Sequence, residues 1–421
     1  MGPLWVPAFS IAVLAAGLGA EAGARVWYVT PDGAGDAPTI QAAITAAIPG
    51  DEVLVAAGSY GWSAQGGDSL ALNGPTMLTM RSGVAVRSES GPDVTTIDAE
   101  GKGRVVRFEA TTGGLIEGFT IRGGNAAHAG PPGHYSKGVG GGILCRYSLS
   151  VKIVGNVVRE NYSATGGGGI GIVDAHLLIR GNVVSKNFSM GTTGGISVSG
   201  GGANVTIEGN TIAENVGGGV FCFDSIVAIS QNLILNNVPS ALLPGDGVRC
   251  YSDSVTLTCN NSWGNPGGDF MCGSGVGNIS DDPLVCSGSK DYKLQPRSPC
   301  LPQNNGCGLL IGARGECTTT DVYDGRPPRA GLWVAASPNP FHPQTRITYV
   351  LRPTVERVCL TVYDLRGRWV VRLVDGQESG TIRSVLWNGK DERGRPAAAG
   401  VYIVRLDLGS DTTATKLVLA K

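Results

Sequence analysis

The sequence has few aromatic residues and almost no net charge, and each shortage excludes a class of protein. Aromatic residues make up 6% of the 421 residues, whereas glycine accounts for 66 of them, about twice its usual share. This combination suits a β-protein dense in turns and argues against a helical enzyme. The formal net charge is −1. That value argues against a nucleic-acid partner, because phosphate binding requires clustered Lys and Arg.

Long apolar runs are absent after the first 20 residues, so we expect no transmembrane segment beyond the N-terminus. The stretch from Leu4 to Ala20 is apolar, and small residues at positions 20–24 offer a cleavage site. Together they predict a secretory signal over residues 1–24. The residues before this stretch include no Lys or Arg, so an uncleaved anchor is the alternative. We therefore expect a secreted or cell-surface protein.

Five copies of one repeat occupy the stretch from Gly140 to Asn265. Each copy opens with glycines and a β-branched residue, continues with alternating apolar residues, and ends with two asparagines five residues apart. The first asparagines are Asn156, Asn182, Asn210, Asn232 and Asn260, and the steps 182−156, 210−182, 232−210 and 260−232 equal 26, 28, 22 and 28. Self-similarity at such a period indicates a solenoid, in which each repeat buries its apolar side by stacking on its neighbours.

Three short strands and no helical pattern are found in each copy. Apolar residues recur at every second position in pairs such as Ile143/Cys145 and Val151/Ile153, and Val158 belongs to a third strand. Three strands per repeat predict one coil of a parallel β-helix. Asparagine tolerates the left-handed backbone of tight turns, and asparagines in register hydrogen-bond along a stack. We therefore expect the five first asparagines to form a structural ladder.

The two ends of this solenoid need covers, because exposed strand edges recruit other chains. Residues 38–48 place Ile40, Ile44 and Ile48 on one helical face, with Pro38 in the first turn, and predict a helix that caps the first coil. Six of the ten cysteines lie from Cys259 to Cys317, where the alternation fades and loops need pinning. Their pairing is left open. Cysteines at inward positions, namely Cys145, Cys222 and Cys250, are expected to behave as small buried apolar residues.

A second unit follows residues 318–334, which have the composition of a linker. Alternation resumes in separate antiparallel-type strands at 347–351, 358–362, 385–387, 401–403 and 417–419, with turns at 365–368 and 391–394. This pattern predicts a small β-sandwich over residues 335–421. This unit has 13 Lys/Arg and 8 Asp/Glu, a net charge of 13−8 = +5.

Both units resemble known families. The repeats resemble the right-handed parallel β-helix of the pectin-lyase-like superfamily over residues 25–317. That fold occurs in lyases, hydrolases, adhesins and non-enzymatic surface proteins, so it does not decide the activity. The segments "SPNPF", "TVYDLRGRWV" and "TKLVLAK" resemble the FlgD-type immunoglobulin-like domain and are similar to C-terminal sorting domains of the type IX secretion system. This resemblance implies a module for export or surface attachment; the alternative is a stabilising spacer.

The outward positions of the glycine-led strands supply the candidate ligand-binding residues. Phe221, Phe223 and Tyr251, flanked by Arg249, are expected to form an aromatic surface that stacks on sugar rings. The alternative is that the linker or the second unit packs on them. Further candidates are Arg146 in the same outward row and Tyr135 in the extra loop "AAHAGPPGHYSKG".

Three aspartates and one histidine are the candidates for catalysis. Asp174, Asp224 and Asp253 follow the glycine-led strands, and His134 lies in the extra loop. Carboxylates at these places suit acid/base chemistry or Ca²⁺, but Asp is commoner as a turn residue. The Gly-His-Gly and Arg-Ile-Lys motifs of the galacturonan hydrolases of this superfamily are absent, and we find no metal-ligand spacing.

We therefore expect an exported β-helix protein that binds polysaccharide, or adheres to cells, without catalysis. A cell-envelope polymer and the secretion or attachment machinery are its expected partners. The alternative is a polysaccharide lyase or glycoside hydrolase with a non-standard site.

Overall fold

The computed structural model describes residues 23–69, 74–127, 138–240, 244–251, 254–272, 275–286, 292–317, 333–337, 341–351, 356–378, 382–409 and 411–420. Most of the expected signal and linker, together with the candidates His134, Tyr135 and Asp253, lie outside these residues.

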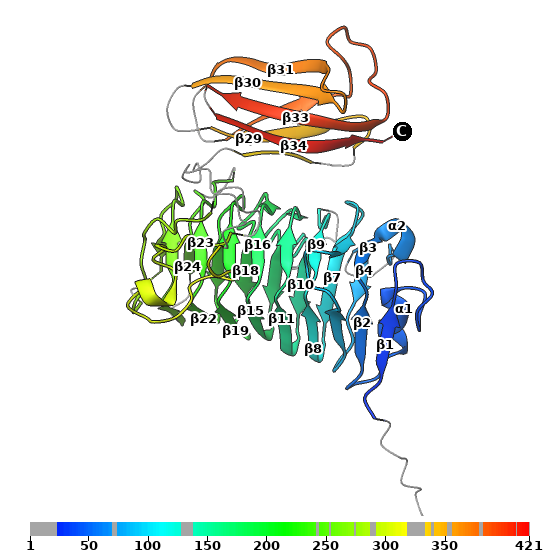
Figure 1. The fold of residues 1–421 in the computed structure, drawn as a ribbon, viewed down its shortest axis with the longest axis vertical. Coiled ribbons are helices and arrows are strands. Elements are labelled where there is room, and N and C mark those ends of the chain that lie inside the picture. Colours follow the sequence, from blue (N-terminus) through cyan, green and yellow to red (C-terminus); the bar gives the residue numbers. More distant parts are fainter. Residues whose placement is uncertain are drawn as a thin grey trace, which may run out of the picture.

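The first unit is a right-handed parallel β-helix, as its sequence predicts (Figure 1). Its coils contribute one strand each to three parallel sheets, which we call sheets A, B and C. Sheet A consists of β1 (Val26–Val29), β2 (Glu52–Val55), β5 (Ala85–Ser88), β8 (Thr112–Glu117), β11 (Leu149–Val154), β15 (His176–Arg180), β19 (Asn204–Glu208), β22 (Ile226–Ser230) and β25 (Val255–Thr258).

Sheets B and C have the same coil order. Sheet B consists of β3 (Gly58–Gly61), β6 (Thr95–Asp98), β9 (Thr120–Arg122), β12 (Val157–Arg159), β16 (Val183–Ser185), β20 (Thr211–Ala213), β23 (Leu233–Leu235) and β26 (Asn261–Trp263). Sheet C consists of β4 (Thr76–Thr79), β7 (Arg104–Glu109), β10 (Ile143–Arg146), β14 (Ile170–Val173), β18 (Ile196–Ser199), β21 (Val220–Phe223), β24 (Val248–Tyr251) and β27 (Phe270–Met271). The short strands β13 (Tyr162–Ser163) and β17 (Phe188–Ser189) pair outside these sheets.

The core fills the space between the three sheets with the apolar residues that the period-2 pattern places inward. Ile143, Ile153 and Val158 represent the three strands of one coil, and each is fully buried. Their equivalents in the next coils, Ile170, Ile179 and Val184, stack directly on them in register. The free energy of folding of a coil therefore depends on its neighbours, as in other solenoids.

Two asparagine ladders, rather than one, flank the strands of sheet B. Each first asparagine donates from Nδ2 to Oδ1 of the next coil's asparagine, at 3.1, 3.0, 3.0, 3.0 and 2.9 Å along Asn156, Asn182, Asn210, Asn232, Asn260 and Asn278. The second asparagines do the same along Asn161, Asn187, Asn215, Asn237 and Asn265. Each Oδ1 also accepts a backbone N–H from the preceding coil, for example that of Asn182. The side chains thus satisfy backbone groups that the turns would leave unpaired.

The turns differ from expectation in one respect. The left-handed backbone lies at the residue before each first asparagine, with φ of 62°, 65° and 61° at Gly155, Gly181 and Gly209 and of 59° and 56° at Gln231 and Cys259. Glycine takes this conformation without a Cβ penalty, which explains its use in three of the five coils. The asparagine side chain therefore contributes the hydrogen bonds and not the turn geometry.

A short helix, α1 (Ile40–Ala46), packs against β1, β2 and β4 at the N-terminal end of the β-helix (Figure 1). Ile40 and Ile44 are buried, but Ile48 lies beyond the helix and is 48% exposed. Pro38 precedes the helix instead of lying in its first turn, and Thr39 is the N-cap, because its hydroxyl accepts the N–H of Ala42 at 3.0 Å. A second helix, α2 (Trp62–Gln65), follows β3 directly.

At the other end, residues 275–286 and 292–317 fold back over the outer face of sheet B, and we call these residues the strap. Its apolar residues, among them Val285, Leu294 and Ile311, bury Leu233 and Leu235, which point outward from β23. The strap also contains the 3-10 turn η1 (Pro302–Asn304). The outward residues Val183, Ala213, Leu233 and Leu235 of β16, β20 and β23 are therefore apolar because a second layer covers them.

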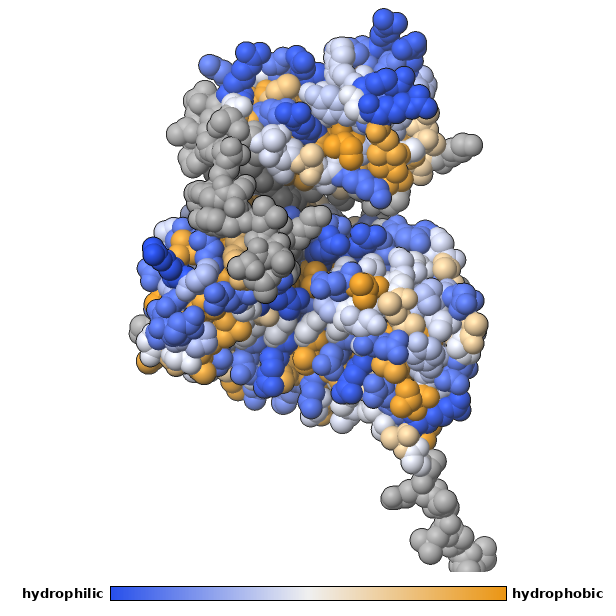
Figure 2. All heavy atoms as spheres, in the orientation of Figure 1, coloured by the Kyte–Doolittle hydropathy of each residue, from blue (hydrophilic) through white to orange (hydrophobic). Residues whose placement is uncertain are grey.

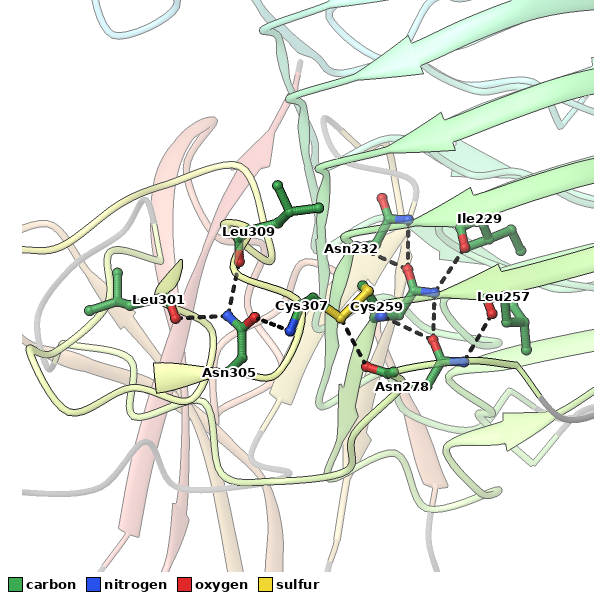
Figure 3. The surroundings of a disulfide bond; sticks show 11 residues. Ile229, Asn232, Leu257, Cys259, Asn278, Leu301, Asn305, Cys307 and Leu309 are labelled. Carbon is green, nitrogen blue, oxygen red and sulfur yellow. Dashed lines mark hydrogen bonds between the residues drawn. A yellow bond between two sulfur atoms is a disulfide. The ribbon is translucent and has the colours of Figure 1, made fainter. Parts of the chain in front are cut away.

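Disulfides hold this end together. Cys259–Cys307 joins the last ladder turn to the strap beside Asn278, where the ladder ends (Figure 3). Cys286–Cys317 closes the strap on itself, and Cys250–Cys272 joins β24 to the chain that follows β27. Cys250 is thus bonded and not a free apolar residue, whereas Cys145 and Cys222 are free, buried thiols.

The second unit is a small β-sandwich of two antiparallel sheets. One consists of β28 (Trp333–Ser337), β29 (Thr345–Val350) and β32 (Ile382–Trp387), and the other of β30 (Glu356–Asp364), β31 (Trp369–Glu378), β33 (Gly400–Leu408) and β34 (Asp411–Leu419). Leu360, Val404 and Trp387 belong to its core. The sequence pattern missed β28 and β31, and on β33 the buried residues are Tyr402, Val404, Leu406 and Leu408 rather than Val401 and Ile403.

Within the part of the chain that is described, no helix is long and apolar enough to cross a membrane.

Candidate functional site

The outward row of sheet C contains most of the candidate ligand-binding residues. Its positions are in register from coil to coil, with Leu144 beside Gly171, Gly171 beside Ser197, Ser197 beside Phe221 and Phe221 beside Arg249. The second outward position of each strand forms a parallel row of Arg146, Val173, Ser199, Phe223 and Tyr251. The sheet therefore brings residues about 100 positions apart into one surface.

The interior coils of this row are covered. Leu144 is fully buried although it points outward, because it packs with Val139 and Val173. A Cβ on Gly171 would lie 2.4 Å from a methyl group of Val139, so this close cover depends on glycine. Arg146 is 5% exposed and forms an ion pair with Glu109, with Nη2 to Oε1 at 2.6 Å. Arg146 thus lies outside the exposed surface, and we leave it out of the proposed site.

The last coils of the row are open. We call Phe221, Phe223, Arg249, Tyr251 and Met271 the aromatic patch. Phe223, Tyr251 and Met271 are 52%, 55% and 48% exposed. The rings of Phe221 and Tyr251 are 5.8 Å apart between centroids and tilted by 55°. These three large apolar side chains are exposed on adjacent strands. A ligand that covers them buries their apolar surface, and this burial favours binding.

Arg249 is fixed within the patch by two partners. Its Nε donates to Oδ2 of Asp246, and its Nη1 donates to the Tyr251 hydroxyl at 3.1 Å. The hydrogen bond to the Asp246 carboxylate raises the pKa of Arg249 above its ordinary value, so the guanidinium stays charged. The guanidinium carbon also lies 6.0 Å from the Tyr251 ring centroid. The patch therefore presents apolar rings beside a fixed cation.

Asp246 and Met271 were missed by the sequence interpretation. Asp246 is 3% exposed and orients Arg249. Its carbonyl accepts the N–H of Gly219, just as the carbonyl of Gly218 accepts that of Gly195. The equivalent position is thus glycine in the preceding coil, and the change from Gly to Asp was the available signal. Met271 belongs to β27, a strand of two residues that is too short for a period-2 pattern.

The aspartates proposed for catalysis occupy turns. Asp174 and Asp224 have φ of 48° and 46°, and the equivalent position in other coils is Ala110 or Tyr147 with the same left-handed backbone. A Cβ on Gly200 would meet Asp174 Oδ1 at 2.2 Å, and one on Gly201 would meet Asp224 Oδ2 at 3.3 Å, so a glycine turn separates the two carboxylates. Among the residues that the structure describes, no group of three or more His, Cys, Asp or Glu is placed to hold a metal ion.

The outer faces of sheets A and B are less suited to binding a ligand. The outer face of sheet B lies under the strap from β16 to β23. The outer face of sheet A carries ion pairs between exposed side chains, such as Arg87–Glu117 and Arg180–Glu208, which are typical of a solvated surface. On the side seen in Figure 2, apolar residues form separate small areas among polar ones. The aromatic patch is thus the best candidate site on the described part of the β-helix.

Comparisons with known proteins agree with the fold of the first unit. A family model described as a right-handed β-helix region matches residues 53–212. No curated protein matches the chain.

Solved structures show only distant likeness. Latent PorU from Porphyromonas gingivalis is 22% identical over 24% of this chain and 10% of its own, with a TM-score of 0.20. PorZ, a surface component of the type IX secretion system of the same species, is 20% identical over 21% and 11%, with a TM-score of 0.17. The tailspike gp49 of Acinetobacter baumannii bacteriophage Fri1, a capsular polysaccharide depolymerase, is 10% identical over 88% and 73%, with a TM-score of 0.21. This chain thus spans about a tenth of PorU and PorZ, and such TM-scores carry no functional argument.

Proposed function

We propose that this protein is an exported β-helix protein that binds polysaccharide through the aromatic patch and does not cleave it. The second unit, on this proposal, is a FlgD-type immunoglobulin-like module that serves export or attachment to the cell surface.

The observation that carries the proposal is the aromatic patch itself. Phe223 and Tyr251 are more than half exposed on adjacent strands, and Arg249 is held beside them by Asp246. Sugar rings have apolar faces that stack on aromatic rings and hydroxyls that hydrogen-bond to fixed polar groups. The paired strands β21 and β24 hold these groups side by side before the ligand binds, which lowers the entropic cost of binding.

A binding role fits the patch better than a hydrolytic one. Glycoside hydrolysis needs two carboxylates that flank the scissile bond. Two carboxylates adjoin the patch among the described residues: Asp224 lies in the left-handed turn directly after Phe223, and Asp246 is buried and paired with Arg249. A carboxylate in such an ion pair positions a cation and is a poor proton donor.

Export is supported by the three disulfides. Disulfides persist in oxidising compartments and are rare in the cytosol. All three lie between Cys250 and Cys317, where the coils lose their regular strands. The apolar stretch from Leu4 to Ala20 supplies the expected signal.

A glycan array with product analysis tests the proposed function. We expect the mature protein to bind one class of polysaccharide, with the chain length of that polysaccharide unchanged after prolonged incubation. Shortened products would show that the protein is a lyase or hydrolase. Absence of binding across neutral and acidic glycans would remove the polysaccharide role altogether.

The attachment role is tested by deletion of residues 335–421 in the producing cell. We expect the truncated β-helix to keep its melting transition and to change its distribution among periplasm, cell surface and medium. An unchanged distribution would reduce the second unit to a spacer.

A further inference from the structure

The β-sandwich contains two turns with the same five-residue pattern, Asp-x-Arg-Gly-Arg, at residues 364–368 and 391–395. In the first, Asp364 Oδ1 accepts the N–H groups of Arg366 and Arg368 at 2.9 and 3.0 Å. In the second, Asp391 Oδ1 accepts those of Arg393 and Arg395 at 3.0 and 2.9 Å. The glycines have the same φ of 76°. The sandwich has thus built one turn geometry twice.

Each turn pairs one of its arginines and leaves the other free. Arg368 Nε donates to Asp364 Oδ2 at 2.7 Å, and Arg395 Nε donates to Asp391 Oδ2 at 2.9 Å. Arg366 and Arg393, at the matched central positions, are exposed. Neither makes an ion pair with any residue that the structure describes. The turns therefore present two unpaired guanidinium groups in equivalent settings.

The two turns lie at the same end of the sandwich. The N–H of Glu392 donates to the carbonyl of Val370 at 3.0 Å, and the N–H of Arg372 donates to Glu392 Oε2 at 3.1 Å. Val370 and Arg372 come directly after the first turn, on β31, the edge strand of its sheet. Glu392 thus fastens the second turn to the strand that leaves the first.

Apolar side chains accompany these arginines. Leu365 is 70% exposed and Trp369 is 53% exposed. The guanidinium carbon of Arg372 lies 5.9 Å from the Trp369 ring centroid. We call Leu365, Arg366, Trp369, Arg372 and Arg393 the basic turn surface.

Net charge concentrates here. Residues 364–372 and 390–395 contain six Lys/Arg (366, 368, 372, 390, 393 and 395) and three Asp/Glu (364, 391 and 392), a net of 6−3 = +3 in 9+6 = 15 residues. Residues 335–421 have a net of 13−8 = +5. Asp375, just beyond the first segment, pairs with Arg372 at 2.7 Å and lowers this local net charge to 3−1 = +2, next to an exposed indole.

We propose that the basic turn surface binds an anionic glycan, with a sugar ring on Trp369 and carboxylate or phosphate groups on Arg366 and Arg393. Arginine matches the geometry of both kinds of anion, and tryptophan supplies a ring for stacking. This proposal deepens the attachment role proposed above by naming its ligand class and its residues. It does not depend on what the aromatic patch of the β-helix binds.

The test measures binding of the full-length mature protein to immobilised polygalacturonate across a range of salt concentrations. We expect the R366Q/R393Q double variant to bind at least tenfold more weakly and to lower the slope of log K against log[salt] by about two. The matched control is R346Q/R405Q, which removes two exposed arginines from strands β29 and β33 of the same unit. An equal loss in the control, or wild-type binding by R366Q/R393Q, would overturn the proposal.

A second probe separates a glycan from any other polyanion. Inorganic polyphosphate has the charge without a sugar ring, so we expect Trp369→Ala to weaken binding to polygalacturonate and to leave binding to polyphosphate unchanged. Equal effects on both probes, or no effect on polygalacturonate, would refute the glycan assignment. The F223A/Y251A variant of the β-helix separates the two proposals. On that background the loss caused by R366Q/R393Q is expected to be the same as in the otherwise wild-type protein, because it arises in the second unit. A loss in F223A/Y251A together with wild-type binding in R366Q/R393Q would place this ligand on the β-helix and contradict the present proposal.

Discussion

The interior coils of the β-helix and its C-terminal end use the same residue types in different ways. In the interior, Cys145 and Cys222 are free and buried, whereas Cys250 and Cys259 at the end are disulfide-bonded. Leu144 points outward and is fully buried, whereas Phe223 points outward from the same sheet and is 52% exposed. Regular stacking stabilises the interior by itself, while the end needs covalent links and leaves apolar side chains free for a ligand.

The largest expected effect comes from the strap disulfide. Replacing both Cys259 and Cys307 by Ser opens a loop closed over a sequence separation of 48, which is expected to cost about 4 kcal/mol of the free energy of unfolding. Thermal melts with and without reductant, together with limited proteolysis, measure the loss. The double variant is expected to be cleaved first within residues 275–317.

The interior thiol is the control for that experiment. Cys145→Ala removes a buried thiol that is in no disulfide. The difference in melting temperature between this variant and the wild type is therefore expected to be the same with and without reductant. If reductant left the melting temperature and the proteolysis of the wild-type protein unchanged, the terminal coils would be as stable without disulfides as the interior coils are.

A smaller loss of stability is expected from substitutions in the outward rows of sheet C, where Leu144 is buried and Phe223 is exposed. Leu144→Ala leaves a cavity beneath Val139 and Val173 and is expected to cost about 3 kcal/mol. Phe223→Ala removes a surface ring and is expected to change stability by no more than about 0.5 kcal/mol. Denaturant midpoints compare the two, and equal losses would mean that Phe223 is covered in solution.

Substitutions in the asparagine ladder are expected to cost less free energy of unfolding, and less at the end of the ladder than in its interior. Asn182→Ala and Asn210→Ala each remove buried hydrogen bonds to both neighbouring coils and are expected to cost about 2 kcal/mol. Asn278→Ala, at the half-buried end of the ladder, is expected to cost less. Half-buried Thr206→Ala is the control, and an equal loss at Thr206 would argue against the ladder as a source of stability.

The sequence predicts the features of the fold that repeat from coil to coil, and few of the features that occur once. Inward residues such as Ile153 and Ile179 follow from the period of two, and the ladder follows from the spacing of the asparagines. The strap has no such period, because it packs on sheet B through scattered residues such as Val285 and Ile311. The first part of β33 is apolar on both faces, and Arg405 and Asp407, which mark the outward face, lie beyond the predicted strand at 401–403.

The candidate site shows the same limit. The period of two places Phe221, Phe223, Arg249 and Tyr251 outward, and they lie together in register. It places Arg146 outward as well, yet Arg146 is 5% exposed. Whether an outward side chain is buried depends on contacts between segments far apart in the sequence, and a local pattern does not contain these contacts.

The affinity of the aromatic patch for its polysaccharide tests the central claim most directly. Using the glycan that the array identifies, we expect F223A/Y251A to bind about tenfold more weakly, or roughly 1.4 kcal/mol, since each ring loses its stacking partner. Tyr147→Ala is the matched control, because Tyr147 is 49% exposed on another coil and is expected to be dispensable. Isothermal titration measures all three proteins after their melting temperatures are compared. Wild-type affinity in F223A/Y251A, or an equal loss in Tyr147→Ala, would contradict the proposal that this patch is the binding site.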